Sequence, residues 1–383
     1  MDAVLKFGRL TEHMALETDG DVSPAAPVAC GISPQDPPGV VYAAAVGGKR
    51  VKLLKTLLTS ACERDCLYCP FRAGRDFHRE TMRPEELSMA YVRMHQAGLV
   101  EGLFLSSGIA GGGVKTQDRL ITSAEILRQK LGYRGYLHLK IMPGSERSQV
   151  ERAMMLADRV SINLEAPNEL RLGRLAPQKD YWKELITPLK WAEEIRKSSP
   201  QELTWKGRWP SLTTQFVVGA AGETDLELLS TSEYLFRQFR LARTYFSVFN
   251  PVSDTPLENQ PPENPTRQLR LYQSAFLLRD YGYTLEDFNF ETGGFLPLGL
   301  DPKKAWAEQN LCNQPVEINK ADRAQLLRIP GIGPKTAAKV LEACRRNPIK
   351  ELSDLQRLGV PLDKAVPYIL LNGIKPVRQL SLW

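Results

Sequence analysis

Three cysteines stand close together in the segment Cys62-Glu-Arg-Asp-Cys66-Leu-Tyr-Cys69, with the spacing C-x3-C-x2-C. Thiolates select soft metals, such as zinc or iron–sulfur clusters. Three thiolates are one fewer than a closed four-cysteine site needs. An iron–sulfur cluster held by three cysteines leaves one iron open to bind a ligand and do chemistry. We therefore predict such a cluster; the alternatives are a zinc knuckle without a visible fourth ligand and three unrelated buried thiols.

The remaining cysteines, Cys30, Cys312 and Cys344, are scattered along the chain. Six cysteines in 383 residues do not make a disulfide scaffold. We expect these three to be buried apolar side chains, and the alternative is that one or more of them ligates a second site.

The elements that must position the cysteine loop alternate regularly from about residue 39. Short apolar runs predict strands, and longer periodic segments predict helices. The predicted strands are residues 39–46, 49–60, 102–107, 136–142, 159–165, 212–218 and 244–250. The predicted helices are residues 84–97, 118–131, 146–156, 181–197, 224–239 and 267–281. Six such strand–helix units imply an α/β fold with a parallel sheet and right-handed crossovers, open or closed into a barrel.

Polar residues and glycines follow several of these strands. Ligands of parallel α/β folds bind at the carboxyl ends of the strands, so these residues are candidates for a site. Ser106-Ser107-Gly108 ends one strand, and glycine there allows a ligand or another backbone to approach closely. Ser161, Asn163 and Glu165 end another strand, and alternation directs all three to one face. A polar triple on a central strand must be hydrogen-bonded or functional.

The cysteine spacing, with the aromatic Tyr68 before the last cysteine, resembles the cluster motif of the radical S-adenosylmethionine (SAM) superfamily. The resemblance implies one [4Fe-4S] cluster, with Cys62, Cys66 and Cys69 as its ligands and SAM on the fourth iron. An electron then cleaves SAM to a 5′-deoxyadenosyl radical. It also implies a partial (β/α)6 barrel of the TIM type, with the cluster loop after the first strand.

Further segments resemble the superfamily's SAM-binding segments, in the expected order, between about residues 51 and 265. Ser107 and Gly108 resemble the segment whose backbone accepts the SAM amino group; the alternative is a flexible loop. Asn163 and Glu165 resemble an Asn-x-Asp pair that binds the ribose hydroxyls, with Glu in place of Asp.

Two more cofactor contacts are implied by the same resemblance. Arg174, preferred over Arg171, resembles the partner of the SAM carboxylate; the alternative is a solvated surface arginine. Gly219 and Glu223 resemble a Gly-x-x-x-Glu turn beside the adenine. The resemblance names no catalytic residue.

The loop after Cys69 is strongly basic and carries interleaved aromatic residues. Arginine binds phosphates in a bidentate manner and stacks on bases. We expect Arg72 and Arg75 to grip a nucleic-acid backbone near the mouth of the barrel, and the alternative is a solvated charged loop.

Two predicted helices flank the segment Pro330-Gly331-Ile332-Gly333-Pro334-Lys335, the first with Asn319 as a candidate cap. This pattern resembles the helix-hairpin-helix module. Backbone N–H groups at Gly331 and Gly333 and at the start of the second helix would then bind a DNA phosphate, with Lys335 and Lys339 adding charge. Ile332 would be a buried plug, and residues 353–373 resemble a second, degenerate copy. The alternative is a protein-interaction or capping domain.

Composition sets the remaining limits. The net charge of +6 permits nucleic acid as a partner without demanding it. No apolar run reaches about 18 residues, so we expect no transmembrane helix. Residues 1–21 carry too many charges for a signal peptide, and a reducing cytoplasm suits cysteine-ligated iron.

The combination of motifs resembles a family described as DNA modification or repair radical SAM proteins, sometimes linked to a uracil-DNA-glycosylase-like partner. The expected domains are 1–50, an N-terminal helix and lead-in strand; 51–283, the barrel; 284–315, a wrapping linker; and 316–383, the helix-hairpin-helix domain. We expect an enzyme that modifies or repairs a nucleotide in DNA, with flavodoxin or ferredoxin as reductant. The alternatives are an RNA substrate and a non-catalytic DNA-binding protein whose cluster is structural or redox-sensing.

Overall fold

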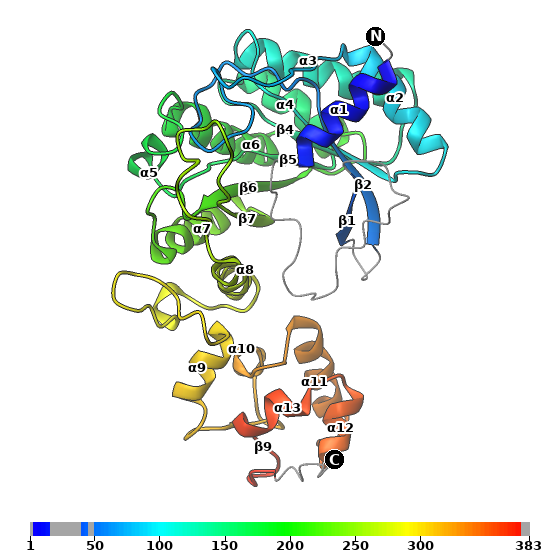
Figure 1. The fold of residues 1–383 in the computed structure, drawn as a ribbon. Coiled ribbons are helices and arrows are strands. Elements are labelled where there is room, and N and C mark those ends of the chain that lie inside the picture. The colour runs from blue at the N-terminus through cyan, green and yellow to red at the C-terminus, as the bar shows by residue number, and fades with distance from the viewer. Residues whose placement is uncertain (1–2, 16–39, 45–49, 377–383) are drawn as a thin grey trace. The chain divides into compact units, whose positions relative to one another are not determined.

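The computed structural model describes residues 3–15, 40–44 and 50–376, so the prediction for Cys30 lies outside the described residues (Figure 1). Contacts divide the chain into two compact units, and we describe each by itself. One comprises residues 1–223 and 234–268, and the other comprises residues 224–233 and 269–383. The domain boundaries expected after residues 50, 283 and 315 stay predictions.

The first unit is built on a seven-stranded sheet whose strands follow one another in sequence order. The sheet curls into a half-barrel (Figure 1), which confirms the predicted partial barrel. β1 runs antiparallel to β2, and β2 to β7 are parallel, as the six predicted units require. The strands are β1 Val40–Ala44, β2 Arg50–Leu57, β3 Gly102–Ser106, β4 Tyr136–Lys140, β5 Arg159–Ser161, β6 Ser211–Val218 and β7 Arg243–Val248.

The two faces of this sheet differ in chemistry. Leu54, Leu103 and Leu137 are register partners on one face, and all three are fully buried. The other face carries the ladder Lys55, Phe104, His138 and Arg159. Residues paired in a parallel ladder point to the same side, so one face is apolar and the other face is polar and partly basic.

One helix, α1, precedes the strands, and the other helices connect or follow them. They are α1 Ala3–Ala15, α2 Pro84–Gln96, α3 Gly113–Glu125, α4 Arg147–Leu156, α5 Glu169–Gly173, α6 Thr187–Ser198, α7 Asp225–Phe239 and α8 Pro265–Asp280. α2 begins at Pro84 as predicted, and the Glu86 carboxylate accepts a hydrogen bond from the Arg83 N–H, 3.0 Å away. α3 begins five residues before the predicted position 118, directly after Gly112.

The second unit is mostly helical around its own apolar core. After α8 it contains α9 Pro302–Asn310, β8 Val316–Glu317, α10 Arg323–Arg328, α11 Pro334–Arg346, α12 Leu352–Arg357, α13 Leu362–Ala365 and β9 Ile369–Leu370, with β8 parallel to β9. The predicted cap of α10 was wrong. The Asp322 carboxylate accepts from the Gln325 N–H, 2.7 Å away, while the Asn319 amide bonds both the N–H and the C=O of Ile349.

The cysteines outside the motif correct another expectation. Cys312 is exposed and Cys344 is half-buried, so neither is the fully buried side chain that we predicted. The five described cysteines form no disulfide. Within the described ranges, we find no helix with both the length and the apolar character needed to cross a membrane.

Candidate metal centre and nucleic-acid interface

The loop with the three motif cysteines leaves β2 and returns to α2. Its two ends are joined at the base, because the Ser60 N–H donates to the Glu80 carbonyl and the Met82 N–H donates to the Leu58 carbonyl, at 2.9 and 3.0 Å. These hydrogen bonds close the loop at its base. The loop lies at the carboxyl ends of the strands, where parallel α/β folds bind their ligands.

Cys62, Cys66 and Cys69 line one cavity of about 80 Å3. Residues that end or follow β3, β4 and β5 complete its wall, together with a lysine from the loop that follows α5. Among them are Ser106, Ser107, Gly108, Lys140, Asn163, Glu165 and Lys179. The structure therefore brings four of the six predicted cofactor-binding residues to the cysteines.

The sulfur atoms have surroundings that suit a cluster. The Phe71 N–H points at the Cys69 sulfur and the Ile109 N–H at the Cys62 sulfur, at 3.4 and 3.5 Å. Hydrogen bonds to the sulfurs are among the features that tune iron–sulfur sites. In the described part of the chain, no three His, Cys, Asp or Glu side chains are arranged to hold one metal ion. In a cluster that is held by three cysteines each thiolate binds a separate iron, so Cys62, Cys66 and Cys69 would each hold one iron.

Gly108 is required by packing. A β-carbon at this position would overlap the carbonyl oxygen of Ala61, and the Gly108 N–H donates to the Thr59 carbonyl at 2.7 Å. The end of β3 thus lies directly against the backbone that leads into Cys62. The following glycines are also ordered, since the N–H groups of Gly111 and Gly112 donate to the Glu63 carboxylate at 2.9 and 3.0 Å.

A buried ion pair lies in the wall of the cysteine cavity. The Lys179 ammonium is 3.0 Å from the Glu165 carboxylate, and Tyr68 also hydrogen-bonds to Glu165. Burial would raise the pKa of Glu165, but Lys179 and Lys140 outweigh it and hold that pKa below its ordinary value. Burial likewise would lower the pKa of Lys179, but Cys66 and Glu165 outweigh it and raise that pKa.

Sequence reasoning missed both lysines. Lys140 ends β4, and a polar residue at the carboxyl end of a buried strand is the signal that could have found it. Lys179 lies in a loop without a motif, and no local pattern marks it.

Arg174 and Gly219 do not line the cysteine cavity. The Arg174 guanidinium instead donates to the Ala221 carbonyl at 3.4 Å. The turn from Gly219 to Glu223 is a hydrogen-bonded unit, in which the Glu223 carboxylate accepts from the N–H groups of Gly219 and Ala221. Burial raises the pKa of Glu223. The assignment of Arg174 and Gly219 to SAM stays a prediction.

In the basic loop after Cys69, arginine side chains make hydrogen bonds to backbone carbonyls, and most of these carbonyls belong to the loop itself. The Arg79 guanidinium donates to four backbone carbonyls, those of Ser60, Phe71, Arg72 and Arg75. The Arg75 guanidinium donates to the carbonyls of Pro70 and Ser253, both at 3.0 Å. A phosphate contact by Arg72 and Arg75 therefore stays a prediction.

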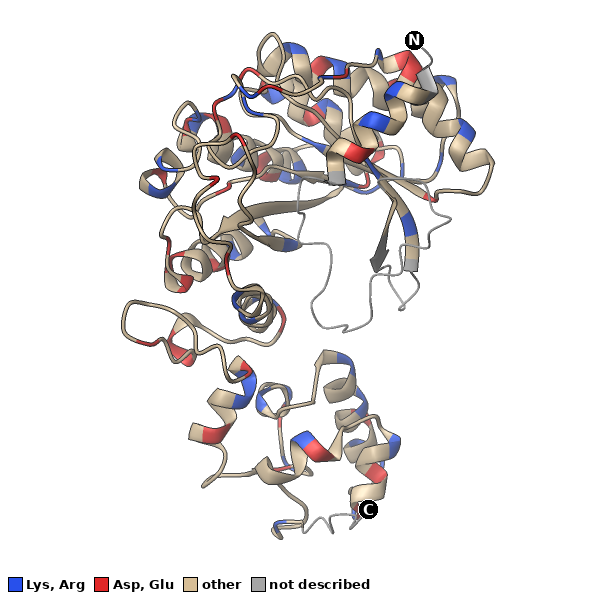
Figure 2. Cartoon of the chain, in the orientation of Figure 1, with Lys and Arg blue, Asp and Glu red and all other residues tan. Residues whose placement is uncertain are grey.

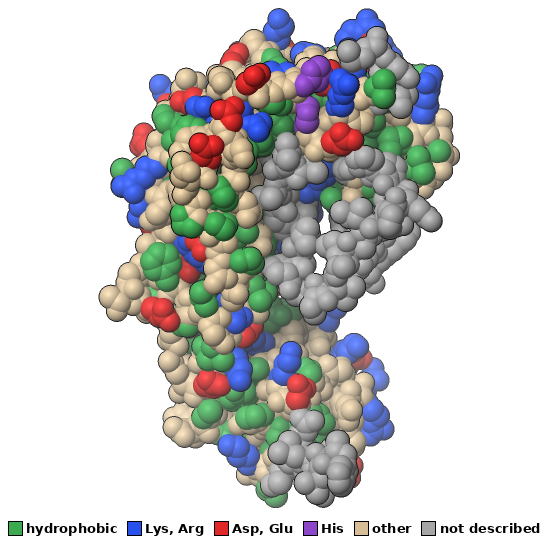
Figure 3. Space-filling view, viewed as in Figure 1, with side chains coloured by type: hydrophobic (Ala, Val, Ile, Leu, Met, Phe, Trp, Pro, Cys, Tyr) green, Lys and Arg blue, Asp and Glu red, His purple; other side chains and the backbone are tan. Residues whose placement is uncertain are grey.

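The hairpin of the second unit has the predicted local geometry. Gly331 has a φ of 86°, which favours glycine, and Ile332 is fully buried as predicted. Gly333 precedes α11, whose first N–H groups have no partner within the helix. Lys335 and Lys339 are exposed and four residues apart, so they share one face of α11. Basic side chains gather over α11 and α12 (Figures 2 and 3).

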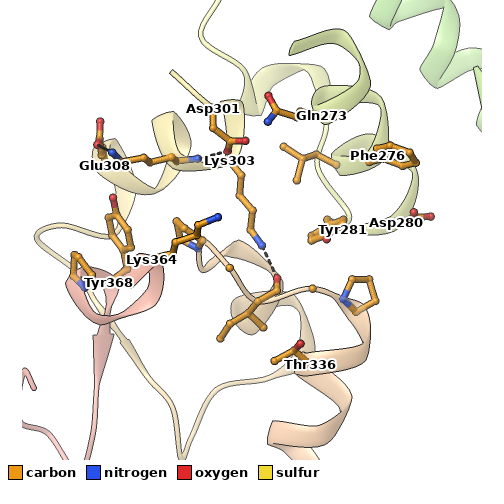
Figure 4. A pocket seen from close by; sticks show the side chains of 18 of the residues that line it. Gln273, Phe276, Asp280, Tyr281, Asp301, Lys303, Glu308, Thr336, Lys364 and Tyr368 are labelled. Carbon is orange, nitrogen blue, oxygen red and sulfur yellow. Dashed lines mark hydrogen bonds and ion pairs between the residues drawn. The ribbon is translucent and has the colours of Figure 1, made fainter. Parts of the chain in front are cut away.

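A cavity of about 1200 Å3 lies beside the same hairpin (Figure 4). Its wall combines α8, α9, the hairpin and α13. Lys303 points from α9 into this cavity, and its ammonium lies 4.6 Å from the centre of the Tyr281 ring. Burial lowers the pKa of Lys303 to about 7.

Comparisons with known proteins agree with the two motifs. The model of the Radical SAM superfamily matches residues 56–235, and the model of the helix-hairpin-helix motif matches residues 315–343. No protein of curated function matches the chain.

Solved structures also resemble part of the chain, at low sequence identity. The hydrogenase maturase HydG from Carboxydothermus hydrogenoformans is 13% identical, with a TM-score of 0.46, over 59% of this chain and 51% of that one. Methylornithine synthase PylB is 14% identical, with a TM-score of 0.47, over 61% and 64%. Coproporphyrinogen III oxidase HemN from Escherichia coli is 12% identical, with a TM-score of 0.35, over 58% and 51%. The chain thus spans less than two thirds of each of these proteins.

The cysteine motif, the half-barrel and the family match all indicate a radical SAM domain. Residues 56–235 form a radical SAM domain, and its family implies a [4Fe-4S] cluster and SAM as cofactors. The chain thus contains a radical SAM domain and, near its C-terminus, a helix-hairpin-helix motif.

Proposed function

We propose that this enzyme modifies or repairs a nucleotide in DNA. The observation that carries the proposal is the union, in one chain, of a radical SAM domain with a well-formed helix-hairpin-helix motif. The first supplies chemistry on unactivated C–H bonds, and the second has the geometry of a phosphate-binding element.

The hairpin supports nucleic acid as the partner. Backbone N–H groups at the start of a 13-residue helix, α11, offer partial positive charge to a phosphate, and Lys335 and Lys339 add full charges. Contacts of this kind read the phosphate backbone and carry no sequence code. We therefore expect non-specific and salt-sensitive binding of DNA.

The inner face of the half-barrel supports a polar substrate. Lys55 is buried and its ammonium lies 5.9 Å from the centre of the Phe104 ring. The His138 ring contacts the Ser161 hydroxyl at 2.9 Å, and the Arg159 guanidinium donates to the Tyr245 hydroxyl at 3.0 Å. Cations and aromatic rings on one face suit a nucleotide, which joins a phosphate to a base that can stack.

The residues that would hold the cofactors follow from the cavity. Cys62, Cys66 and Cys69 would ligate the cluster. Ser107, Gly108, Asn163 and Glu165 line the same cavity and would contact SAM. When bound, SAM supplies the 5′-deoxyadenosyl radical that abstracts hydrogen from the substrate. A base in duplex DNA would have to be single-stranded or flipped to meet it.

The partners follow from the same chemistry. Radical SAM enzymes need an electron donor, and we propose flavodoxin or ferredoxin in the cytoplasm. A uracil-DNA-glycosylase-like protein is a further proposed partner, because DNA repair joins base removal to other steps.

Mass spectrometry of nucleosides tests the proposal. DNA and RNA labelled with deuterium are each incubated with the reduced, cluster-loaded enzyme and SAM. We expect a new nucleoside from DNA and deuterium in the 5′-deoxyadenosine that is released. Deuterium transfer from RNA alone would replace DNA with RNA as the substrate. Release of 5′-deoxyadenosine without transfer from either polymer would remove nucleic acid as the substrate.

A further inference from the structure

The segment that carries Lys179 is fastened to the cysteine loop. The Leu67 N–H donates to the Leu175 carbonyl at 2.7 Å. The Arg64 guanidinium donates to the Gln178 carbonyl at 2.9 Å, and the Gln178 N–H donates to the Asp65 carboxylate at 3.3 Å. These contacts come from residues on both sides of Cys66, so the position of Lys179 is coupled to that of the cysteine.

The ion pair itself is buried in the wall of the cysteine cavity. The side chains of Lys179 and Glu165 are 8% and 5% exposed, and both line the cavity of Cys62, Cys66 and Cys69. A buried ion pair is costly to desolvate and often adds no stability over an apolar pair. Its place beside three thiolate ligands indicates an electrostatic role toward what they hold.

Coulomb's law gives the direction of that role. A cluster gains one negative charge when it is reduced, and a fixed positive charge nearby favours the reduced form. Local charge and burial are among the features that set cluster potentials. We propose that Lys179 is a positioning residue that raises the reduction potential of the cluster at Cys62, Cys66 and Cys69, and that Glu165 holds the ammonium in place while offsetting part of its charge.

Other groups fit this assignment. The Glu165 carboxylate, 3.0 Å from the Lys179 nitrogen, favours the charged ammonium. Lys140 also lines the cavity and adds positive charge, whereas the Arg64 guanidinium, which lines the cavity too, is paired with the Glu184 carboxylate. The inference concerns electron transfer into the cluster, so it does not depend on which substrate the enzyme uses.

Redox titration followed by electron paramagnetic resonance tests it on the full-length, cluster-loaded protein without SAM. Lys179→Met removes the charge at similar length, and we expect a lower midpoint potential than in the wild type. Glu165→Gln removes the opposing charge at nearly constant shape, and we expect a higher one. The double variant Lys179→Met/Glu165→Gln removes a neutral pair, so its potential should return toward the wild-type value.

The two single variants should shift the midpoint potential in opposite directions, which an electrostatic role predicts and a purely structural role does not. Iron content is measured for every variant, and Lys183→Met, at an exposed lysine, is the matched control. A Lys179→Met potential equal to that of the control would overturn the proposal, as would shifts of the two single variants in the same direction. If Lys179→Met does not retain iron, Glu165→Gln decides alone: a raised potential supports the proposal, and an unchanged one overturns it.

Discussion

The Lys303 ammonium donates a hydrogen bond to the carbonyl oxygen of Ile332, 2.6 Å away, at the tip of the helix-hairpin-helix turn (Figure 4). Lys303 precedes the motif and belongs to α9, and its side chain is 9% exposed. The contact satisfies a carbonyl of the tight turn between Gly331 and Gly333. A residue outside the hairpin thus supports the conformation on which the proposed phosphate binding depends.

The same contact predicts a pH dependence of stability. Burial, opposed by Asp301 and aided by Arg328, lowers the pKa of Lys303 from 10.5 to about 7. Between these values the unfolded chain binds a proton that the folded unit does not, so the free energy of unfolding should rise as pH increases from about 7 to 10.5. The rise is on the order of a few kcal/mol. Urea denaturation across this range measures it.

Lys303→Met provides the comparison for that measurement. The variant should lose this rise with pH, because methionine has no group that titrates in this range. It should also unfold more easily by about 1–3 kcal/mol at high pH, since the Ile332 carbonyl loses its donor. Parallel curves for variant and wild type would show that Lys303 does not titrate in this range.

Lys335 and Lys339 should act as phosphate contacts on α11. Replacing each by Ala should weaken DNA binding equally for all sequences and reduce the slope of log affinity against log salt by about 1. Fluorescence anisotropy at several salt concentrations measures both effects. Lys190→Ala, at an exposed lysine of α6, is the control and should leave the slope unchanged. An unchanged slope for both α11 variants would exclude this face of α11 as a DNA contact.

The hairpin glycines give a separate test that preserves charge. Gly333→Ala places a methyl group 3.1 Å from the Tyr281 hydroxyl and close to the N–H groups that we expect to bind phosphate. We expect weaker DNA binding with little loss of stability. Gly331→Ala is more disruptive, because φ is 86° and the new methyl would overlap Pro361, so it should also destabilise the unit by about 1–3 kcal/mol. Wild-type affinity in a folded Gly333→Ala variant would count against the hairpin.

Local patterns were enough to predict most elements but not their long-range contacts. The apolar runs around Leu54, Leu103 and Leu137 predicted strands, and the sheet pairs them in the expected order. Asn319 has the chemistry of a helix cap, yet its amide bonds Ile349, thirty positions further on. Local helix-capping propensity cannot predict that a distant residue such as Ile349 will take the hydrogen bonds of this side chain.

In the candidate site, too, local patterns predicted some residues, while a long-range contact was not predicted. Their places at strand ends made Ser107, Gly108 and Asn163 candidates for a site, because strand ends of a parallel sheet meet at one edge, and all three line the cysteine cavity. The pairing of Glu165 with Lys179 had no such signal. Glu165 has a φ of 65°, outside the extended strand geometry on which our alternation argument relied.

Gly108 should be essential for loading the cluster. Gly108→Ala forces the backbone of β3 away from the Ala61 carbonyl, which precedes Cys62, so the cysteine cavity should open. We expect a clear loss of iron per chain after reconstitution and a loss of stability of about 1–3 kcal/mol. Gly173→Ala in α5 is the matched control, because its β-carbon would meet nothing within 4 Å. Equal iron content in the two variants would contradict the packing argument.

Asn163 and Arg174 should differ in their effect on SAM binding. Asn163 is 8% exposed, lines the cysteine cavity and contacts Gln215 at 3.4 Å, so its amide can reach a ligand there. Asn163→Ala should weaken SAM binding by about 0.5–1.5 kcal/mol, the usual net contribution of one hydrogen bond. Arg174 lies outside that wall, and Arg174→Ala should have the smaller effect if its guanidinium stays on Ala221. Equilibrium dialysis of SAM against the cluster-loaded variants measures both. A larger loss for Arg174→Ala would show that the guanidinium leaves Ala221 to bind the SAM carboxylate, as the family resemblance implies.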